Sequence, residues 1–400
     1  MTRDVLRMLA EARPQELDPE APVDEGTRRA ELTRAMTAPP RSTRVEAVAP
    51  ARRRVRPMWG LGLVGAAAAA ALVVATTATG PGDPGTVAGP KTGGTPKGEA
   101  RTPVTMNAQT VLLSAAAGAD KEALTTGAYW HVLRTNRAHH QVGKGENRYM
   151  IVTTDTDEGW TPNKPGGKAW GRQQYLGAKP LTAKDVAAWQ RAGSPSSFKI
   201  DFSTRGGTVK PANYEVAPGK ARTSSSKLVN DDKVFWLGRN VTMKDLRDLP
   251  ADPKRLKASL LRWYGGHSTE TTSEPMKADD WLWAVTKGLI TDMPVTPQVR
   301  AGAFRMLAQL KSIKAVGPVQ DGAGRTGTAL VLLERTKNYG TLEHRLIIDE
   351  ARGRALGYDI VSLKPSGADA MPAGSLLSSS TIDEAGWTNV APTKADAAGG

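Results

Sequence analysis

The stretch from residue 321 to residue 363, DGAGRTGTALVLLERTKNYGTLEHRLIIDEARGRALGYDIVSL, decides the fold class of this chain. Three apolar runs, at 328–334, 341–350 and 354–363, are joined by turns at KNYG (337–340) and EARG (350–353). Short runs rich in Val, Ile and Leu that are bounded by Gly and Asn are typical of β-strands. Because the connections are too short for a helical crossover, we predict that neighbouring strands are antiparallel.

The same stretch contains the pattern G-x-G-x-x-G at Gly322, Gly324 and Gly327, which also occurs in dinucleotide-binding enzymes. In those enzymes the glycines follow a strand and open a helix whose N-terminus faces the pyrophosphate. Here they precede an apolar run that ends in a turn, and Pro318 upstream has no amide hydrogen to donate. Asp349 alone favours the dinucleotide alternative, because it stands where a ribose-binding acid would. We interpret the pattern as a hairpin turn.

The strand pattern recurs on both sides of this stretch, and helices lie in between. Strands are predicted at 127–135, 147–155, 168–176, 195–203, 232–238 and within 375–387, with turns at 157–159 and 163–168. Helix starts are predicted from the capping residues Thr182, Asp252 and Thr296 and from the pair Asp279–Asp280. Strands, then helices, then strands indicate an α+β domain with a largely antiparallel sheet.

One apolar segment, MWGLGLVGAAAAAALVVATTAT at residues 58–79, is long enough to cross a bilayer as a helix. The charges just before it are Arg52, Arg53, Arg54 and Arg56, whereas the charges after it balance. By the positive-inside rule we predict a single-pass protein of the cell membrane with a cytoplasmic N-terminus. A cleaved signal peptide is the alternative, but the sequence before the segment is much longer than such peptides use.

This segment divides the chain into parts of different composition. Residues 1–57 hold many prolines and few large apolar residues, so we predict a mostly disordered cytoplasmic tail. The tail either docks a cytoplasmic partner or only supplies the charges that set the topology. Residues 80–104 have the composition of a flexible Gly/Pro/Thr linker. Residues 105–400 form the predicted extracytoplasmic α+β domain.

The composition limits the chemistry of the chain. It has 400 residues and no cysteine, which excludes disulfides, iron–sulfur clusters and thiolate zinc sites. The net charge of +14 fits contact with an anionic lipid or wall polymer, and solubility explains it equally well. We expect a membrane as a partner and no nucleic acid.

Candidate metal ligands and catalytic groups are few. Adjacent His139 and His140 would point to opposite faces of a strand, so we expect solvated loop histidines rather than metal ligands. The acids of DTDEG at 155–159 miss the spacing of a calcium loop. The chain has no G-x-S-x-G nucleophile motif. We therefore predict no catalytic residue, no metal site and no cofactor.

Tryptophan is more informative about a ligand site than these polar residues are, and the chain has 10 of them. If the sheet curves with helices on its concave face, several of these side chains would line an apolar cleft. The candidates for this ligand cleft are Trp130, Trp170, Trp236, Trp281 and Trp283. The alternative is ordinary packing in the core and at its rim.

The stretches LPADPKRLKASLL (249–261), TPQVRAGAFRMLAQLKSIKAVGPVQDGAGRTGTAL (296–330) and LEHRLIIDEARGRALG (342–357) resemble an actinobacterial family of single-pass membrane proteins of unknown function. Genes of that family often neighbour a sigma factor, so the resemblance implies a regulatory or envelope role. More distantly, the order of elements is similar to periplasmic lipoprotein carriers and sigma regulators, which implies a curved, half-barrel-like sheet with helices on one face. The tail has neither His nor Cys, which excludes zinc-dependent sigma binding.

Three functions are compatible with these features. The first is a membrane-anchored, extracytoplasmic binding or sensing module of the envelope, without catalysis, whose cleft takes an apolar or lipid-like ligand. The second is a regulator of a sigma factor that acts through residues 1–57. The third is an envelope hydrolase, which requires an acid–base pair in the cleft. The side chains that line the cleft therefore distinguish the first function from the third.

Overall fold

A computed structural model of the chain describes residues 103–392, except 204–208, 237, 270, 271, 273, 337, 338, 368 and 369. The predictions for the tail, for Arg52, Arg53, Arg54 and Arg56, for the membrane helix at 58–79 and for nearly all of the linker lie outside the described residues. Among the helices within the described range, none combines the length and the apolar character that crossing a bilayer requires.

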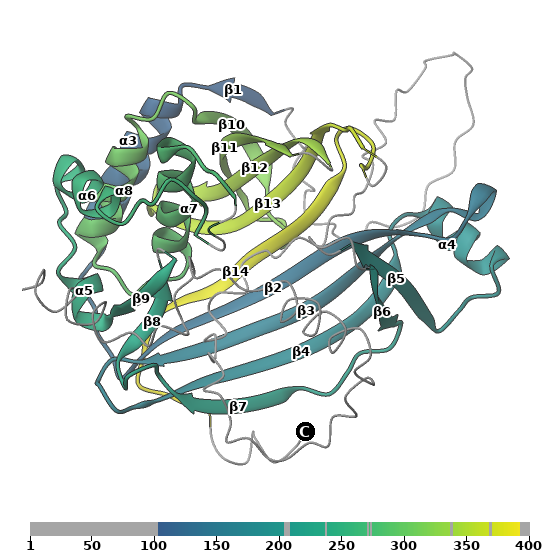
Figure 1. Ribbon diagram of the computed structural model, residues 1–400, viewed down its shortest axis with the longest axis horizontal. Helices are drawn as coiled ribbons and strands as arrows, with labels where there is room; N and C mark the ends of the chain where they lie inside the picture. The colour runs from purple at the N-terminus through teal and green to yellow at the C-terminus, as the bar shows by residue number, and fades with distance from the viewer. Residues whose placement is uncertain are drawn as a thin grey trace, which may run out of the picture. The chain divides into compact units, whose positions relative to one another are not determined.

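One large sheet organises the described part of the chain (Figure 1). Its strands are β1 (Val104–Met106), β2 (Tyr129–Val142), β3 (Tyr149–Pro162), β4 (Lys168–Pro180), β7 (Arg222–Lys227), β10 (Lys314–Gln320), β11 (Thr326–Thr336), β12 (Gly340–Asp349), β13 (Arg354–Lys364) and β14 (Leu376–Thr388). They follow the order β1-β10-β11-β12-β13-β14-β2-β3-β4-β7, and every neighbouring pair is antiparallel. The predicted α+β class with a largely antiparallel sheet is therefore confirmed.

Helices and two small hairpins complete the described elements. The hairpins pair β5 (Ser197–Ser203) with β6 (Val209–Glu215) and β8 (Lys233–Trp236) with β9 (Arg239–Thr242). The helices are α3 (Ala108–Asp120), the 3-10 turn η3 (Gly145–Asn147), α4 (Ala183–Arg191), α5 (Met243–Arg247), α6 (Pro253–Leu261), α7 (Ala278–Thr291) and α8 (Pro297–Leu307). The predicted caps Thr182, Asp252 and Thr296 each accept a hydrogen bond from the backbone three residues on. These three helix starts are therefore confirmed.

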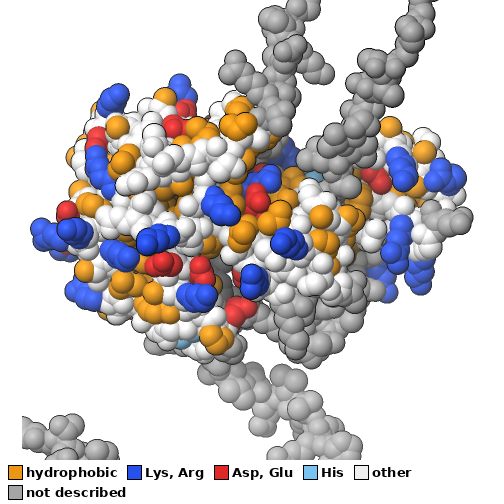
Figure 2. Space-filling view, turned by 90° about the horizontal axis from the view of Figure 1, so that it is seen from above, with side chains coloured by type: hydrophobic (Ala, Val, Ile, Leu, Met, Phe, Trp, Pro, Cys, Tyr) orange, Lys and Arg blue, Asp and Glu red, His pale blue; other side chains and the backbone are white. Residues whose placement is uncertain are grey.

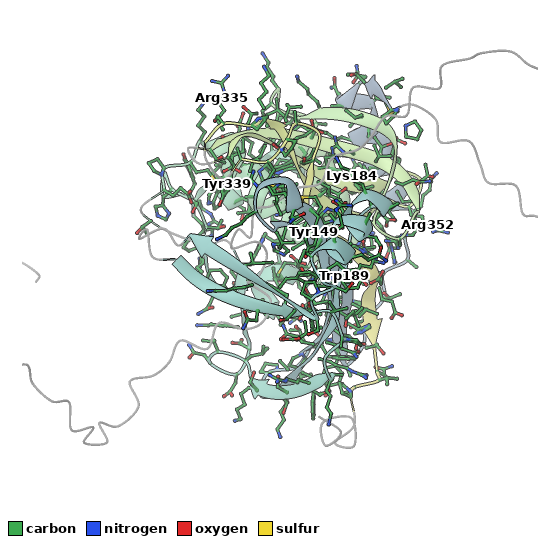
Figure 3. The ribbon with its side chains drawn as sticks, turned by 90° about the vertical axis from the view of Figure 1, so that its right-hand side faces the viewer. Tyr149, Lys184, Trp189, Arg335, Tyr339 and Arg352 are labelled. Carbon is green, nitrogen blue, oxygen red and sulfur yellow. The ribbon has the colours of Figure 1, made fainter. Side chains whose placement is uncertain are left out.

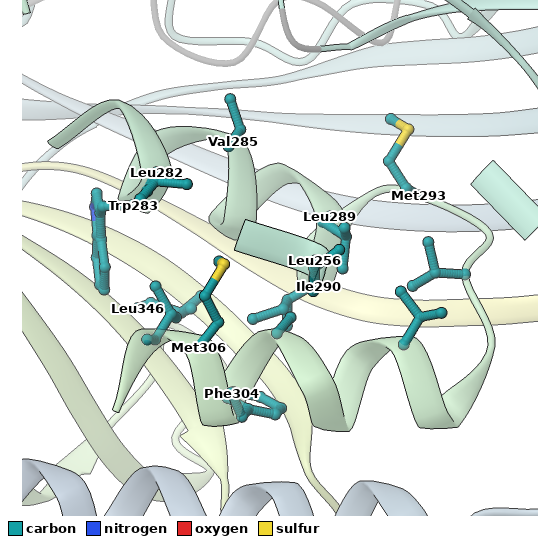
Figure 4. Packing of buried hydrophobic residues seen from close by; sticks show 14 of the residues in the cluster. Leu256, Leu282, Trp283, Val285, Leu289, Ile290, Met293, Phe304, Met306 and Leu346 are labelled. Carbon is teal, nitrogen blue, oxygen red and sulfur yellow. The ribbon is translucent and has the colours of Figure 1, made fainter. Parts of the chain in front are cut away.

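The main core lies between the sheet and the helices α3, α6, α7 and α8 (Figure 4). Leu330 of β11, Leu346 of β12 and Tyr358 of β13 lie opposite one another in register, so they face the same side of the sheet. They share one buried cluster with Trp281 of α7 and Phe304 of α8. Burial of such large apolar side chains is the main favourable contribution to folding.

Helix α3 lies in close contact with the turn between β12 and β13, and Gly353 makes this contact possible. Its φ of +57° is a conformation that residues with a Cβ rarely adopt. A Cβ at this position would also lie 2.7 Å from the Cβ of Ala119 and closer still to backbone atoms of Ala115 and Ala119. The contact brings Glu122, just beyond the helix, to Arg354 at the start of β13.

The glycine-rich loop at 321–325 joins β10 to β11, which are antiparallel neighbours. Asp321 fixes the backbone of this loop, because its carboxylate accepts hydrogen bonds from the amides of Ala323 and Arg325, each at 2.9 Å. Gly324 supplies the positive φ of +79° that the turn requires. The interpretation of this pattern as a hairpin turn, with no helix after it, is therefore confirmed.

The turn predicted at 157–159 is wrong, because these residues lie inside the long strand β3. The acids there have partners on the neighbouring strand β2: a carboxylate oxygen of Glu158 lies 3.0 Å from Nε2 of His131, and Asp157 lies 4.0 Å from Arg134. The chain instead turns at 143–148, whereas the turn predicted at 163–168 does precede β4. Pairing with the neighbouring strand therefore determines the conformation of 157–159, although the local sequence DEG favours a turn.

The expectation that His139 and His140 are solvated loop residues is also wrong. Both lie in β2, and their exposed fractions are only 5% and 1%. The ring of His140 stacks on Tyr214 of the β5–β6 hairpin, with the ring centroids 5.4 Å apart. Burial lowers the pKa of each imidazole to about 4, so both are neutral at neutral pH.

Candidate functional site

A cleft of about 1110 Å³ lies between helix α7 and the face of strands β11, β12 and β13. Trp283, Ala284 and Lys287 contribute to its α7 wall, and Trp236 of β8 closes one side. Sites for small organic ligands usually have volumes of about 300–1,000 Å³, so this cleft is large enough for such a molecule.

A chain of polar contacts crosses the sheet wall of the cleft, from Glu334 on β11 through His344 on β12 to Tyr358 on β13. A carboxylate oxygen of Glu334 lies 2.6 Å from Nε2 of His344, and the Tyr358 hydroxyl contacts Nδ1 of the same ring. The register explains the arrangement, because Leu332 faces His344 and Glu334 faces Leu342, which places all four side chains on one face. Both ring nitrogens of His344 therefore have a partner.

The charges around this chain of contacts favour an ionised carboxylate at Glu334. The hydrogen bond from His344, together with the positive charge of Lys287, lowers the pKa of Glu334 although burial opposes the shift. Burial raises the pKa of Tyr358, so its phenol stays protonated. The ammonium group of Lys287 lies 3.9 Å from the centre of the Tyr358 ring, within the range of a cation–π interaction. Burial also raises the pKa of Asp280.

Two of the five predicted cleft tryptophans line this cleft, namely Trp236 and Trp283. Their exposed fractions are 6% and 3%, so each presents only part of its ring to the cleft. The indole Nε1 of Trp236 donates a hydrogen bond to the carbonyl oxygen of Val285 at 3.0 Å. This bond ties the ring to α7 and gives the apolar wall a fixed position.

The other three predicted tryptophans lie elsewhere. Trp281 is 2% exposed and packs in the core, as the alternative interpretation expects. Trp130 of β2 donates a hydrogen bond of 2.8 Å to the Asp292 carbonyl and lines a different cavity. Trp170 is half-buried on β4, where it pairs in register with Trp160. The five candidate tryptophans therefore lie in different places: in the cleft, in the core and on strands beyond the cleft.

Glu334, His344 and Tyr358 were not predicted as site residues. A signal was present in the strand predicted at 341–350, because a period of two places His344 on the same face as the apolar Leu342 and Leu346. The partners on β11 and β13 become evident only from the register. Within the described range, no group of three or more His, Asp or Glu side chains is arranged to hold a metal ion.

Charged side chains on the face shown in Figure 2 are of both signs, and hydrophobic side chains lie among them. A comparison of the chain with protein-family models and with curated proteins finds no match.

Proposed function

We propose that the described domain is an extracytoplasmic binding module of the cell envelope, held at the membrane by the predicted helix at 58–79, and that its cleft takes an amphipathic, lipid-like ligand. The observation that carries this proposal is the combination of an apolar wall with a polar one. The apolar part of the ligand lies against Trp236 and Trp283. A hydroxyl or amine on its polar end donates a hydrogen bond to Glu334, whose carboxylate is ionised.

We also infer that the sheet is the curved, half-barrel-like support that the resemblance implies, with α3, α6, α7 and α8 on one face. The shared core of these four helices with the inward side chains of β10 to β13 supports the inference. Regulation of a sigma factor through residues 1–57 stays a prediction, because the tail lies outside the described residues.

The test of ligand binding uses the full-length chain and a variant that fills the cleft. Ala284 is half-buried on α7 and lines the cleft, so Ala284→Phe places a ring in the ligand volume. Ala187→Phe, at an exposed position of α4, is the matched control. We expect solvent extraction and mass spectrometry to recover a lipid-like molecule from the wild type and from Ala187→Phe, and little from Ala284→Phe.

A fluorescent long-chain alcohol, 11-(dansylamino)undecan-1-ol, whose hydroxyl can donate to Glu334, gives an independent measurement of the same site. Its Kd should rise at least about tenfold in Ala284→Phe, which corresponds to a loss of roughly 1.4 kcal/mol, and should stay unchanged in Ala187→Phe. Equal affinity in both variants, or a wild-type chain that yields no extractable molecule and binds no probe, would contradict the proposal.

Hydrolysis is a second candidate, because the cleft contains the acid–base pair that this function requires. His344 would accept a proton from water while Glu334 stabilises the imidazolium. In the present geometry Tyr358 occupies the other ring nitrogen, so water must displace its hydroxyl first.

Release of nitrophenol from p-nitrophenyl esters tests this candidate. The His344→Gln variant should lose the activity, whereas His131→Gln should keep it, since His131 pairs with Glu158 away from the cleft. If the wild type hydrolyses the ester no faster than the His344→Gln variant, the hydrolase candidate is wrong.

A further inference from the structure

A second cavity, of about 530 Å³, lies where the end of α3, the β12–β13 turn and β14 meet. Arg352, which lines this cavity, lies near one end of β12, whereas Arg335 and Tyr339, which line the cleft, lie near its other end (Figure 3). Met293, just after α7, contributes to both linings. The two cavities are therefore distinct sites on either side of the end of α7.

The second cavity contains more positive than negative side chains. Its cations are Lys121, Arg300, Arg325, Arg352 and Arg354, and its carboxylates are Glu122, Asp349 and Asp383. The cleft differs, because five carboxylates there accompany four Lys or Arg side chains. Because the site is concave and has an excess of cations, it has a positive electrostatic potential that attracts anions.

Glu122, which lines the cavity, contacts two guanidinium groups, and its single negative charge neutralises only one of them. Arg354 donates to its two carboxylate oxygens, at 2.5 Å and 3.0 Å, and Arg300 also donates to it. The Arg300 side chain is only 9% exposed and donates a further hydrogen bond to the Gly353 carbonyl at 2.9 Å. Because one carboxylate contacts two guanidinium groups, the buried one of Arg300 and the exposed one of Arg354, one positive charge stays uncompensated at this point.

The cations of the cavity also retain donors for a ligand. Each guanidinium group has five N–H donors, and the contacts of Arg300 and Arg354 use only some of them. Lys121 is exposed, and its ammonium group forms no ion pair with any residue that the structure describes. Arg325 differs, because Asp321 and the carbonyl groups of two strands already bind its guanidinium group.

One wall of the cavity is apolar. Trp130 is 8% exposed and Ile290 is 9% exposed, and Leu356 of β13 lies in the same lining. An anion with a carbon substituent would use both the cations and this wall. Phosphate, like carboxylate, presents oxygen atoms that match the paired N–H donors of a guanidinium group, and its larger negative charge suits a site with several cations.

We propose that this cavity binds a phosphate ester, with the phosphate oxygens held by Arg300, Arg354 and Lys121 and the carbon substituent against Trp130. The same chemistry occurs in a phospholipid headgroup and in a soluble organic phosphate. This site does not depend on the ligand proposed for the cleft. Its three cations are the residues that would contact an anionic component of the envelope.

Calorimetric titration of the full-length chain with phenyl phosphate tests the site. The double variant Lys121→Gln/Arg354→Gln should raise the Kd about tenfold, because it removes two charge-assisted contacts. Lys121→Glu alone should raise it about fivefold without disturbing the Glu122 contacts. The control Lys254→Gln/Arg255→Gln removes the same charges from exposed positions of α6 and should leave the Kd unchanged.

Further probes identify the source of the phosphate and separate this site from the cleft. Binding to vesicles of phosphatidylglycerol, but not of phosphatidylcholine, that is lost in the double variant supports a lipid headgroup. Binding of phenyl phosphate without affinity for either vesicle supports a soluble ester. Ala284→Phe, which fills the cleft, should change neither result. Equal affinities in the double variant and its control, or no binding of phosphate in any form, would overturn the proposal.

Discussion

Replacing Gly353 by alanine should destabilise the chain far more than the same replacement at Gly324. Both glycines have a positive φ, +57° at Gly353 and +79° at Gly324. They differ in their surroundings, because a Cβ at Gly324 meets nothing within 4 Å, whereas at Gly353 it overlaps the backbone of α3. The pair therefore separates backbone strain from steric overlap.

The magnitude follows from these two contributions. A residue with a Cβ in the left-handed region costs roughly 1–2 kcal/mol, and this cost applies at both positions. The overlap at Gly353 involves backbone atoms of Ala115 and Ala119, which cannot rotate away as a side chain would. Overpacking of this kind typically costs about 1–3 kcal/mol more. We therefore expect a loss of roughly 1 kcal/mol for Gly324→Ala and roughly 3–4 kcal/mol for Gly353→Ala.

Thermal unfolding of the full-length chain, followed by near-ultraviolet circular dichroism, measures the difference. For a domain of this size about 1 kcal/mol corresponds to a shift of roughly 2–4 °C in Tm. Gly324→Ala should lower the Tm by a few degrees, and Gly353→Ala by roughly three times as much. Equal shifts for the two variants would refute the inference that α3 rests on this turn through a contact that only glycine permits.

Three further predictions concern the core and the buried histidines. Phe304→Ala removes a fully buried ring from α8 and should cost about 3–5 kcal/mol in urea unfolding. Trp236→Phe keeps the apolar wall but removes the indole N–H that ties the ring to the Val285 carbonyl of α7, and it should cost about 1 kcal/mol in the same assay. His139 and His140 have pKa values lowered to about 4, so the unfolded chain, whose histidines titrate near 6.5, binds protons first as the pH falls. Stability should therefore drop by about 2 kcal/mol per histidine between pH 7 and pH 5, and a variant with glutamine at both positions should show a flatter pH profile.

Local signals predicted much of the fold because they act within a few residues. The capping residue Thr182 and the proline that follows Thr296 determine where helices begin, and the glycines at 321–327 determine a turn. Helix α3 was not predicted, although Asn107 caps it. The turn predicted at 157–159 was wrong because pairing with β2 and β4 extends the strand through Gly159.

The sequence by itself therefore determined the kinds of elements and their antiparallel class, since periodicity, caps and short turns are properties of neighbouring residues. Only the tertiary structure decided which side chains share a site. Glu122 meets Arg300 and Arg354, which are 178 and 232 residues away along the chain. Likewise the register of three strands brings Glu334, His344 and Tyr358 together. Such contacts depend on how distant segments pack, and no local pattern records that packing.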